Sequence, residues 1–331
     1  MASASGLNKP GYHLPSLFPS LFSPRQSAIS FALLPCMHAC MYDVCRAVVF
    51  KIGLCQLAVT PDKKRNIKHA RKAIKEAAQK GAQLVVLPMQ GMMHPLQTAM
   101  LAEVSGQLKI TIVGGSIPER CGDKLYYMLP PLKLVCIIFM NSLELQIHLF
   151  DIDIPGKLTF MESKTFTSGE TPTIVDTDVG RIGIGICHDI CFEELAMIYA
   201  SRGAHLICYP GAFNMTLDHR IGSCCRDQRA ADNQILDSGS TGVNSSEPLY
   251  VATCSPARDA GAGYIAWGHS TLVGPFGDVI ATTEHDEDII IAEIDYSILE
   301  QRRTRIPLAK QRRGDLYRLV DIRRLDAHCR L

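Results

Sequence analysis

One short stretch, residues 179–189 with the sequence VGRIGIGICHD, constrains the fold of this chain most strongly. Isoleucine and glycine alternate over 182–186, which predicts a strand with one face of buried side chains and one nearly bare face. Beyond it, apolar residues recur at helical spacing until Gly203, a typical helix stop. Cys187 is therefore expected where the carboxyl end of a strand meets the amino end of a helix.

That position gives Cys187 two interpretations. The positive end of a helix dipole favours a thiolate, the nucleophilic form of cysteine, so Cys187 is a candidate catalytic residue. Free cysteine is also among the most buried residue types, so a structural role fits the position equally well. Position alone does not separate these readings.

Composition indicates a globular protein that binds a small molecule. The chain has 331 residues, of which 47% are hydrophobic, and this is enough for one large domain or two small ones. A net charge of +1 provides no field to attract nucleic acid or a membrane surface, so neither partner is expected. The 13 cysteines are odd in number and scattered through apolar runs, which favours reduced thiols over a disulfide framework.

The first 46 residues differ in composition from the rest. They are rich in Ser, Pro and Leu and contain no acidic residue before Asp43, which resembles an organelle transit peptide. A chloroplast location is the expectation, with the cytoplasm or mitochondrion as alternatives, and a disordered extension or a misplaced start codon is the competing explanation. Cysteine and histidine at 36, 38, 40 and 45 lack the spacing of a zinc site, so no metal is predicted.

Strand and helix patterns alternate in the first half of the chain. Strands are expected at 48–57, 82–88 and 110–113, with helices from about 61 to 81 and 98 to 108, which predicts an α/β protein with parallel strands. The stretch 127–146 fits no regular element. Strands are expected again at 147–150, 173–175 and 204–209. A helix at 219–233 and a loop at 235–248 should follow. The remaining strands, which should be largely antiparallel, are expected at 249–254, 270–273, 279–282 and 289–294.

Two other patterns argue against binding of nucleotides and of nucleic acid. His188 stands where a dinucleotide fingerprint needs its third glycine, and no G-x-x-x-x-G-K occurs, so the phosphate-binding loops are absent from the sequence. Basic residues cluster at 302–313 without interleaved aromatics, which favours a solvated or subunit-contacting tail over a nucleic-acid patch.

Several motifs in order resemble the nitrilase superfamily of carbon-nitrogen hydrolases, and within it the ω-amidase branch of plants. The resemblance extends from about residue 50 to 323 and rests on GIC at 185–187, ELA at 194–196, YPGAFN at 209–214, SPARD at 255–259, WGHST at 267–271, and the segments 147–157 and 162–164. It implies an α-β-β-α sandwich with mixed sheets over residues 47–323, followed by a short tail at 324–331, and association into a homo-oligomer.

The resemblance also implies a chemistry. In that family a cysteine attacks an amide carbon, a glutamate takes the thiol proton and a lysine stabilises the oxyanion, without a cofactor. Cys187 matches the nucleophile, and His188 beside it is the expected substrate-binding residue. The implied reaction releases ammonia from ω-amides of dicarboxylic keto acids, of the 2-oxoglutaramate type.

Other family positions are changed in this chain. The position expected to hold the base, after the second strand, is Met89. The position expected to hold the oxyanion lysine is Gln146, which keeps an amide donor but no charge. A supporting glutamate of the family aligns with Ser223, and an arginine of the family is replaced by Cys191. A catalytically impaired homologue that binds a ligand or a subunit is therefore the alternative function. The departures gather in blocks at 89–96, 127–146, 217–228 and 235–248, which suggests misassigned exon boundaries or retained intron sequence rather than point-by-point drift.

Overall fold

The computed structural model describes residues 49–89, 95–115, 117–121, 124–129, 144–156, 158–213, 248–262, 264–317 and 319–322, all within the unit Cys45–Leu331. The expected extension at 1–46, the cysteine cluster within it, the helix at 219–233, Ser223 and the tail at 324–331 lie outside the described residues. Most of the divergent blocks lie outside them too, but Met89 and Gln146 are described.

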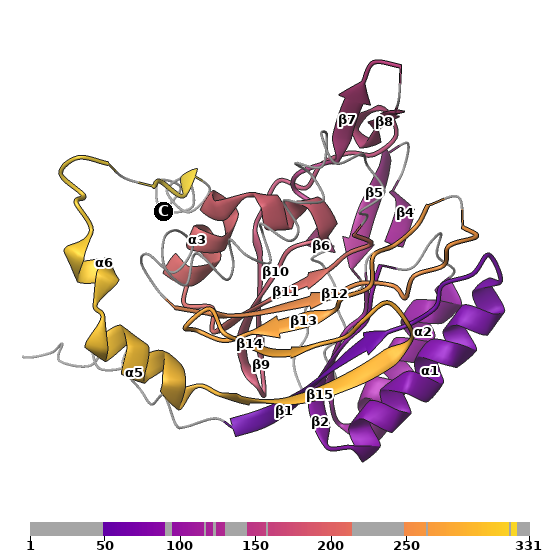
Figure 1. The fold of residues 1–331 in the computed structure, drawn as a ribbon, viewed down its shortest axis with the longest axis horizontal. Coiled ribbons are helices and arrows are strands. Elements are labelled where there is room, and N and C mark those ends of the chain that lie inside the picture. Colours follow the sequence, from indigo (N-terminus) through magenta and orange to yellow (C-terminus); the bar gives the residue numbers. More distant parts are fainter. Residues whose placement is uncertain are drawn as a thin grey trace, which may run out of the picture. The chain divides into compact units, whose positions relative to one another are not determined.

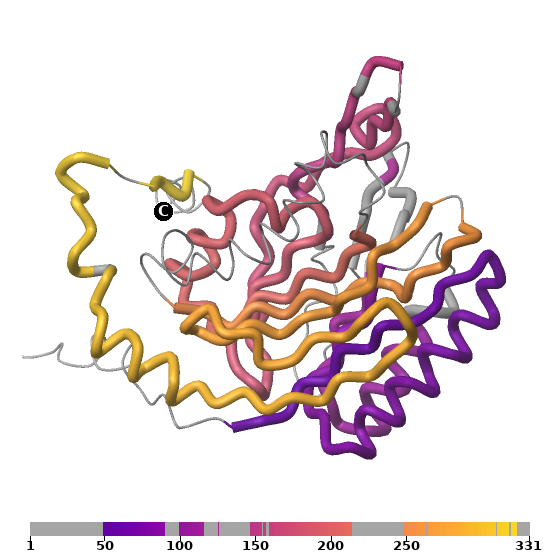
Figure 2. Tube along the Cα trace, in the orientation of Figure 1, coloured from indigo at the N-terminus to yellow at the C-terminus, as the bar shows by residue number. Residues whose placement is uncertain are grey.

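The first sheet has the order β15-β1-β2-β3. Its parallel strands β1 (Val49–Gln56), β2 (Ala82–Val86) and β3 (Thr111–Val113) alternate with the helices α1 (Lys63–Gln79) and α2 (Pro95–Leu108), as predicted. The side chain of Asp62 caps α1 by accepting from the backbone N of Arg65 at 3.1 Å. Strand β15 (Asp288–Asp295) lies antiparallel beside β1, so segments from opposite ends of the sequence are neighbours (Figure 2).

The second sheet has the order β14-β13-β12-β11-β10-β9. Strands β10 (Gly180–Ile184), β11 (Leu206–Pro210) and β12 (Tyr250–Cys254) are parallel. Strands β9 (Thr173–Thr177), β13 (Thr271–Val273) and β14 (Val279–Thr282) extend the sheet antiparallel on either side, in agreement with the antiparallel strands expected late in the chain. Between β10 and β11 the chain forms the 3₁₀ helix η2 (Cys187–Cys191) and the helix α3 (Glu193–Ser201).

Three apolar clusters show how these elements are layered (Figure 1). One cluster contains residues of both sheets, including Ile52 and Leu84 from the first and Ile182 and Leu206 from the second, so the sheets pack face to face. A second joins α1 and α2 to the first sheet, and a third joins α3 to the second sheet. The predicted α-β-β-α sandwich with mixed sheets is confirmed.

Shorter elements lie outside the two main sheets. Strands β4 (Ile117–Cys121), β5 (Lys124–Leu129) and β6 (Glu144–Leu145) form one small sheet, and β7 (Asp151–Ile154) and β8 (Leu158–Met161) form a hairpin. The 3₁₀ helix η1 (Glu162–Lys164) follows this hairpin, and the helices α5 (Ser297–Arg305) and α6 (Leu308–Gln311) follow β15. Within the described residues, no helix combines the length and apolarity needed to cross a membrane.

Two expectations from the sequence need correction. Residues 147–150 form no strand, because their backbone N–H groups bond to side chains, as described below, and β7 starts only at Asp151. The basic segment is not a uniformly solvated tail, since it forms α5 and the side chain of Arg302 is buried, with its guanidinium 5.2 Å from the ring centroid of Phe276.

Candidate active site

Cys187 lies at the carboxyl edge of the second sheet, in a backbone conformation that non-glycine residues rarely adopt. Strand β10 ends at Ile184, and Cys187 opens η2 with a φ of 47°. A left-handed residue of this kind costs about 1–2 kcal/mol, so the surrounding contacts must hold it in place. The backbone N–H of Ala212, which follows the neighbouring strand β11, donates a hydrogen bond to the thiol of Cys187.

The bare glycine face predicted from the sequence has a clear packing reason. A Cβ on Gly185 would lie 2.7 Å from Cδ1 of Tyr209 and 3.3 Å from Cβ of Asp189. A Cβ on Gly183 would lie 2.8 Å from Cγ of Tyr199. Only glycine therefore allows the strand to approach the aromatic rings and η2 closely enough to place Cys187 at the sheet edge.

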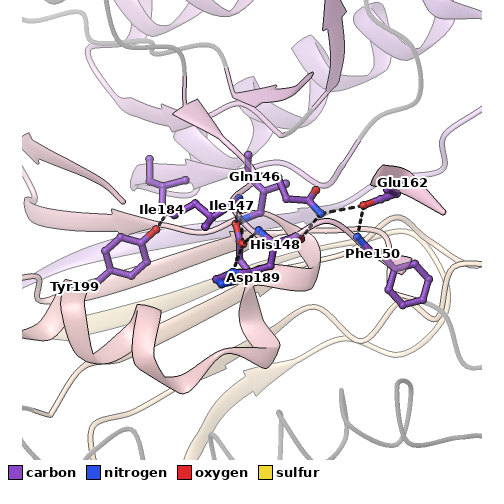
Figure 3. Close-up of polar contacts among 9 residues, drawn as sticks. Gln146, Ile147, His148, Phe150, Glu162, Ile184, Asp189 and Tyr199 are labelled. Atoms are coloured by element: carbon purple, nitrogen blue, oxygen red, sulfur yellow. Dashed lines mark hydrogen bonds and ion pairs between the residues drawn. The ribbon is translucent and has the colours of Figure 1, made fainter. Parts of the chain in front are cut away.

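Asp189 anchors the segment 146–148 to the turn that carries Cys187 (Figure 3). Its carboxylate is buried and accepts hydrogen bonds from the backbone N of Ile186 at 3.0 Å, of Ile147 at 3.2 Å and of His148 at 2.8 Å. It also bonds to Nδ1 of His148 at 2.9 Å. These bonds take the N–H groups that a strand at 147–150 would need for its ladder.

Gln146 and Glu162 form a buried polar pair beside this anchor (Figure 3). Nε2 of Gln146 donates to the backbone oxygen of His148 at 2.7 Å and to Oε2 of Glu162 at 3.1 Å. The same Oε2 accepts from the backbone N of Phe150 at 2.6 Å. Both N–H groups of the amide are used, so the donor that the glutamine was expected to retain for an oxyanion is not available.

Glu162 belongs to the candidate site by its contacts, although the sequence analysis does not single it out. It is a buried carboxylate at the start of η1, directly after the β7–β8 hairpin, and its charge contributes to raising the pKa of the Cys187 thiol. The available signal was its place in segment 162–164, where the family resemblance was already close.

Met89 lies beside the turn that holds Cys187. Its backbone N donates to the oxygen of Gly211 at 3.3 Å, and the next residue, Ala212, donates to the Cys187 thiol. The side chains of Met89 and Cys187 both pack against the cluster between the sheets. A thioether cannot accept the thiol proton, so the expected base position holds no base.

Burial determines the protonation state of Cys187. Protein atoms around the sulfur raise the pKa of the Cys187 thiol to about 12, and the negative charges of Glu162 and Asp189 act in the same direction. The N–H of Ala212 lowers the pKa but does not compensate. The thiolate that a helix amino end was expected to favour is therefore disfavoured here, and the resting group is a neutral thiol.

His188 and Cys191 lie in the 3₁₀ helix η2 that begins at Cys187. The ring of His188 meets Phe150 edge-on at 5.1 Å and Phe192 at 5.4 Å between ring centroids, and burial lowers the pKa of its imidazole. His188 is thus a neutral group at pH 7. The side chain of Cys191 is exposed. Among the residues described, no group of three or more His, Cys, Asp or Glu side chains is arranged to hold a metal ion.

Comparisons with known proteins agree with this geometry. A sequence model of the carbon-nitrogen hydrolase family matches residues 51–304. The chain is 60% identical over 334 residues to the chloroplastic omega-amidase of Arabidopsis thaliana, covering 93% of this chain and 82% of that protein. It is 40% identical over 288 residues to the human omega-amidase NIT2, covering 81% of this chain and 96% of that protein.

Solved structures point the same way. The crystal structure of Saccharomyces cerevisiae Nit3, a member of the nitrilase superfamily, superposes with a TM-score of 0.63 at 32% identity, covering 80% of this chain and 97% of that one. Sequence, layering and the placement of Cys187 thus agree, and the chain belongs to the carbon-nitrogen hydrolase family.

Proposed function

We propose that this chain is a thiol-dependent amidase of the ω-amidase type, with Cys187 as the nucleophile and small ω-amides of dicarboxylic keto acids, such as 2-oxoglutaramate, as substrates. The observation that carries the proposal is the left-handed turn that holds Cys187 at the sheet edge, with the Ala212 N–H on its sulfur. Similarity to omega-amidases over 93% of the chain supports the substrate class.

The reaction has two halves. Sγ of Cys187 bonds to the amide carbon, the C–N bond breaks, and the thiol proton leaves with the nitrogen as ammonia. Water then attacks the thioester carbon, the C–S bond breaks, and the acid and the free thiol are regenerated. His188, next to the nucleophile in the chain, is proposed to contact the substrate as a neutral imidazole.

The residues at the base and oxyanion positions make this reaction slow. A missing general base typically costs about 10²- to 10⁴-fold, and a missing oxyanion donor about 10²- to 10³-fold. The two losses need not multiply, because groups that act together are not additive. With Met89 and Gln146 in place, slow turnover by a neutral thiol is the expected behaviour.

A second candidate function is favoured by the same two positions. A homologue that binds the amide or a related subunit without turning it over needs neither a base nor an oxyanion donor. Both N–H groups of Gln146 are already bonded inside the protein, which suits binding better than catalysis.

Ammonia release separates the two functions. Purified full-length protein is incubated with 2-oxoglutaramate, with Cys187→Ser as the test variant and Cys191→Ser, which changes an exposed thiol, as the matched control. Turnover that is lost only in Cys187→Ser supports the amidase. Substrate binding without ammonia release in any of the proteins supports the second function and contradicts the first.

Location and assembly extend the proposal. The Arabidopsis relative is a chloroplastic protein, and the match covers 93% of this chain, which supports a chloroplast location for this protein. Association into a homo-oligomer is proposed from family membership. Mass measurement by light scattering during size-exclusion chromatography tests it, and a monomer at micromolar concentration would contradict it.

A further inference from the structure

The hydrogen bonds of Gln146 fix which end of its amide faces which neighbour. Nε2 lies 2.7 Å from the backbone oxygen of His148 and 3.1 Å from Oε2 of Glu162, and a backbone oxygen can only accept. A flipped amide would set Oε1 against these oxygens, so the network itself determines the orientation. Every N–H of this side chain is therefore directed into the protein.

The other end of the amide has no hydrogen-bond partner among the residues that the structure describes. Oε1 of Gln146 is buried, and no donor among the described residues lies within hydrogen-bond distance of it. The whole residue is only 1% exposed, so its surroundings are not bulk solvent. A buried acceptor without a donor is unfavourable, and a ligand that brings a donor to it gains affinity.

The position of this acceptor relates it to the reaction centre. Ile147 and His148 are bonded to Asp189, which follows Cys187 by two residues, and Glu162, the partner of Gln146, raises the pKa of the Cys187 thiol. Gln146 also stands where the family resemblance expects the lysine that donates to the substrate carbonyl. The polarity at this position is thus reversed, from a cationic donor to a neutral acceptor.

We infer that Gln146 is a specificity-determining residue whose Oε1 accepts a hydrogen bond from an N–H group of the ligand. The choice of a terminal primary amide as that ligand rests on the proposed function. A ligand that places a carboxylate or a ketone methyl group at this point leaves Oε1 unpaired, and a carboxylate is also repelled by the nearby Glu162.

Three probes that differ only in their terminal group test this inference. Glutarate monoamide ends in –C(O)NH₂, 5-oxohexanoate replaces the NH₂ by CH₃, and glutarate ends in a carboxylate. Affinities are measured by isothermal titration calorimetry on full-length Cys187→Ala protein, so that no probe is turned over. The amide is expected to bind roughly tenfold more tightly than the ketone, the value of one buried acceptor regaining its donor.

Substitutions at Gln146 complete the test. Gln146→Met removes the acceptor and should equalise amide and ketone, whereas Gln146→Lys supplies donors and should reverse the preference towards glutarate. Gln107→Met, at an exposed glutamine bonded to Glu103, is the matched control and should keep the tenfold preference. Circular dichroism of each variant confirms that it folds.

The outcomes separate this inference from the proposed function. Equal affinity for amide and ketone, or a preference that survives in Gln146→Met, overturns the role of Gln146, while ammonia release by the parent protein keeps the amidase proposal intact. If none of the probes binds, the inference is overturned, and if the parent also releases no ammonia from 2-oxoglutaramate, the amidase proposal is overturned with it.

Discussion

The carboxylate of Asp189 holds His148 twice, by its backbone N at 2.8 Å and by its ring Nδ1 at 2.9 Å. With the bonds from Ile147 and Ile186, this side chain joins segment 146–148 to the turn that carries Cys187. The Asp189 carboxylate is buried, so the loss of one of its bonds is costly.

Asp189→Asn should therefore destabilise the protein strongly. The variant places an NH₂ group against N–H donors and removes a buried charge that accepts several of them, which we expect to cost about 2–4 kcal/mol in the free energy of unfolding. Urea denaturation followed by circular dichroism measures it. Asp153→Asn, at an exposed carboxylate that accepts a hydrogen bond from Thr159, is the control and should change the free energy of unfolding by less than about 0.5 kcal/mol. Equal effects in the two variants would contradict the anchoring role of Asp189.

Gly185→Ala should damage both packing and the placement of Cys187. The new methyl group would overlap the ring of Tyr209, which is buried, and overpacking of this kind typically costs about 1–3 kcal/mol. Thermal unfolding and the rate of Cys187 alkylation report the two effects. Gly314→Ala, where no atom of the described residues lies within 4 Å of the added Cβ, should match the parent in both. A parent-like melting temperature in Gly185→Ala would show that the close approach is not needed.

Alkaline pH should destabilise the fold through thiols that are buried, such as Cys55, or partly buried, such as Cys187. Burial raises the pKa of Cys55 and of Cys187 from 9.0 to about 12. Above pH 9 the unfolded chain releases these protons while the folded chain keeps them, so stability falls as pH rises from 9 to 12. The unfolding constant grows up to tenfold per pH unit for each such thiol.

Urea denaturation under reducing conditions at pH 7.5, 9 and 10 measures this loss. Cys55→Ala should make the decline above pH 9 shallower, because one buried thiol is removed, whereas Cys191→Ala, at an exposed position, should leave the decline unchanged. A free energy of unfolding that is constant from pH 7.5 to 10 would refute the prediction.

The sequence predicted the strands and helices of this protein better than the geometry of its candidate site. Apolar runs such as 249–254 gave the strands because a strand buried on both faces leaves a local signature. The start of η2 at Cys187 and its left-handed φ have no such signature, since they depend on Ala212 and Tyr209 from elsewhere in the chain. Segment 147–150 was expected to be a strand because its local sequence is apolar. Asp189, which takes the backbone N–H groups that a strand would use, is about forty residues away and leaves no local signal.

The site itself was only half predictable. Cys187, Met89 and Gln146 could be proposed as site positions from motif order, but the contact of Glu162 with Gln146 depends on a hairpin that brings Glu162 back to this segment. Likewise, the glutamine was expected to offer a donor, and only the bonds to His148 and Glu162 reveal that it offers an acceptor. Hydrogen-bond direction is decided by partners in space, which residue spacing does not specify.

Restoring two side chains should convert slow turnover into efficient catalysis. Met89→Glu places a carboxylate on the segment that bonds to Gly211, next to the Ala212–Cys187 contact, and Gln146→Lys places an ammonium beside the Glu162 carboxylate. The glutamate supplies the base and the lysine supplies a charged donor for the oxyanion. The double variant should raise kcat/KM for ammonia release from 2-oxoglutaramate by about 10²-fold or more, and each single variant by less.

The pH–rate profile of the double variant, and a control that also carries Cys187→Ser, make this prediction specific. The double variant should gain an acidic limb in its pH–rate profile, because a carboxylate base is active only when ionised, whereas the parent rate should keep rising with pH as its thiol with a pKa of about 12 ionises. The same double variant with Cys187→Ser should release no ammonia. A folded double variant that is no faster than the parent would mean that the segments carrying Met89 and Gln146 do not bring these positions to Cys187 as the family chemistry requires.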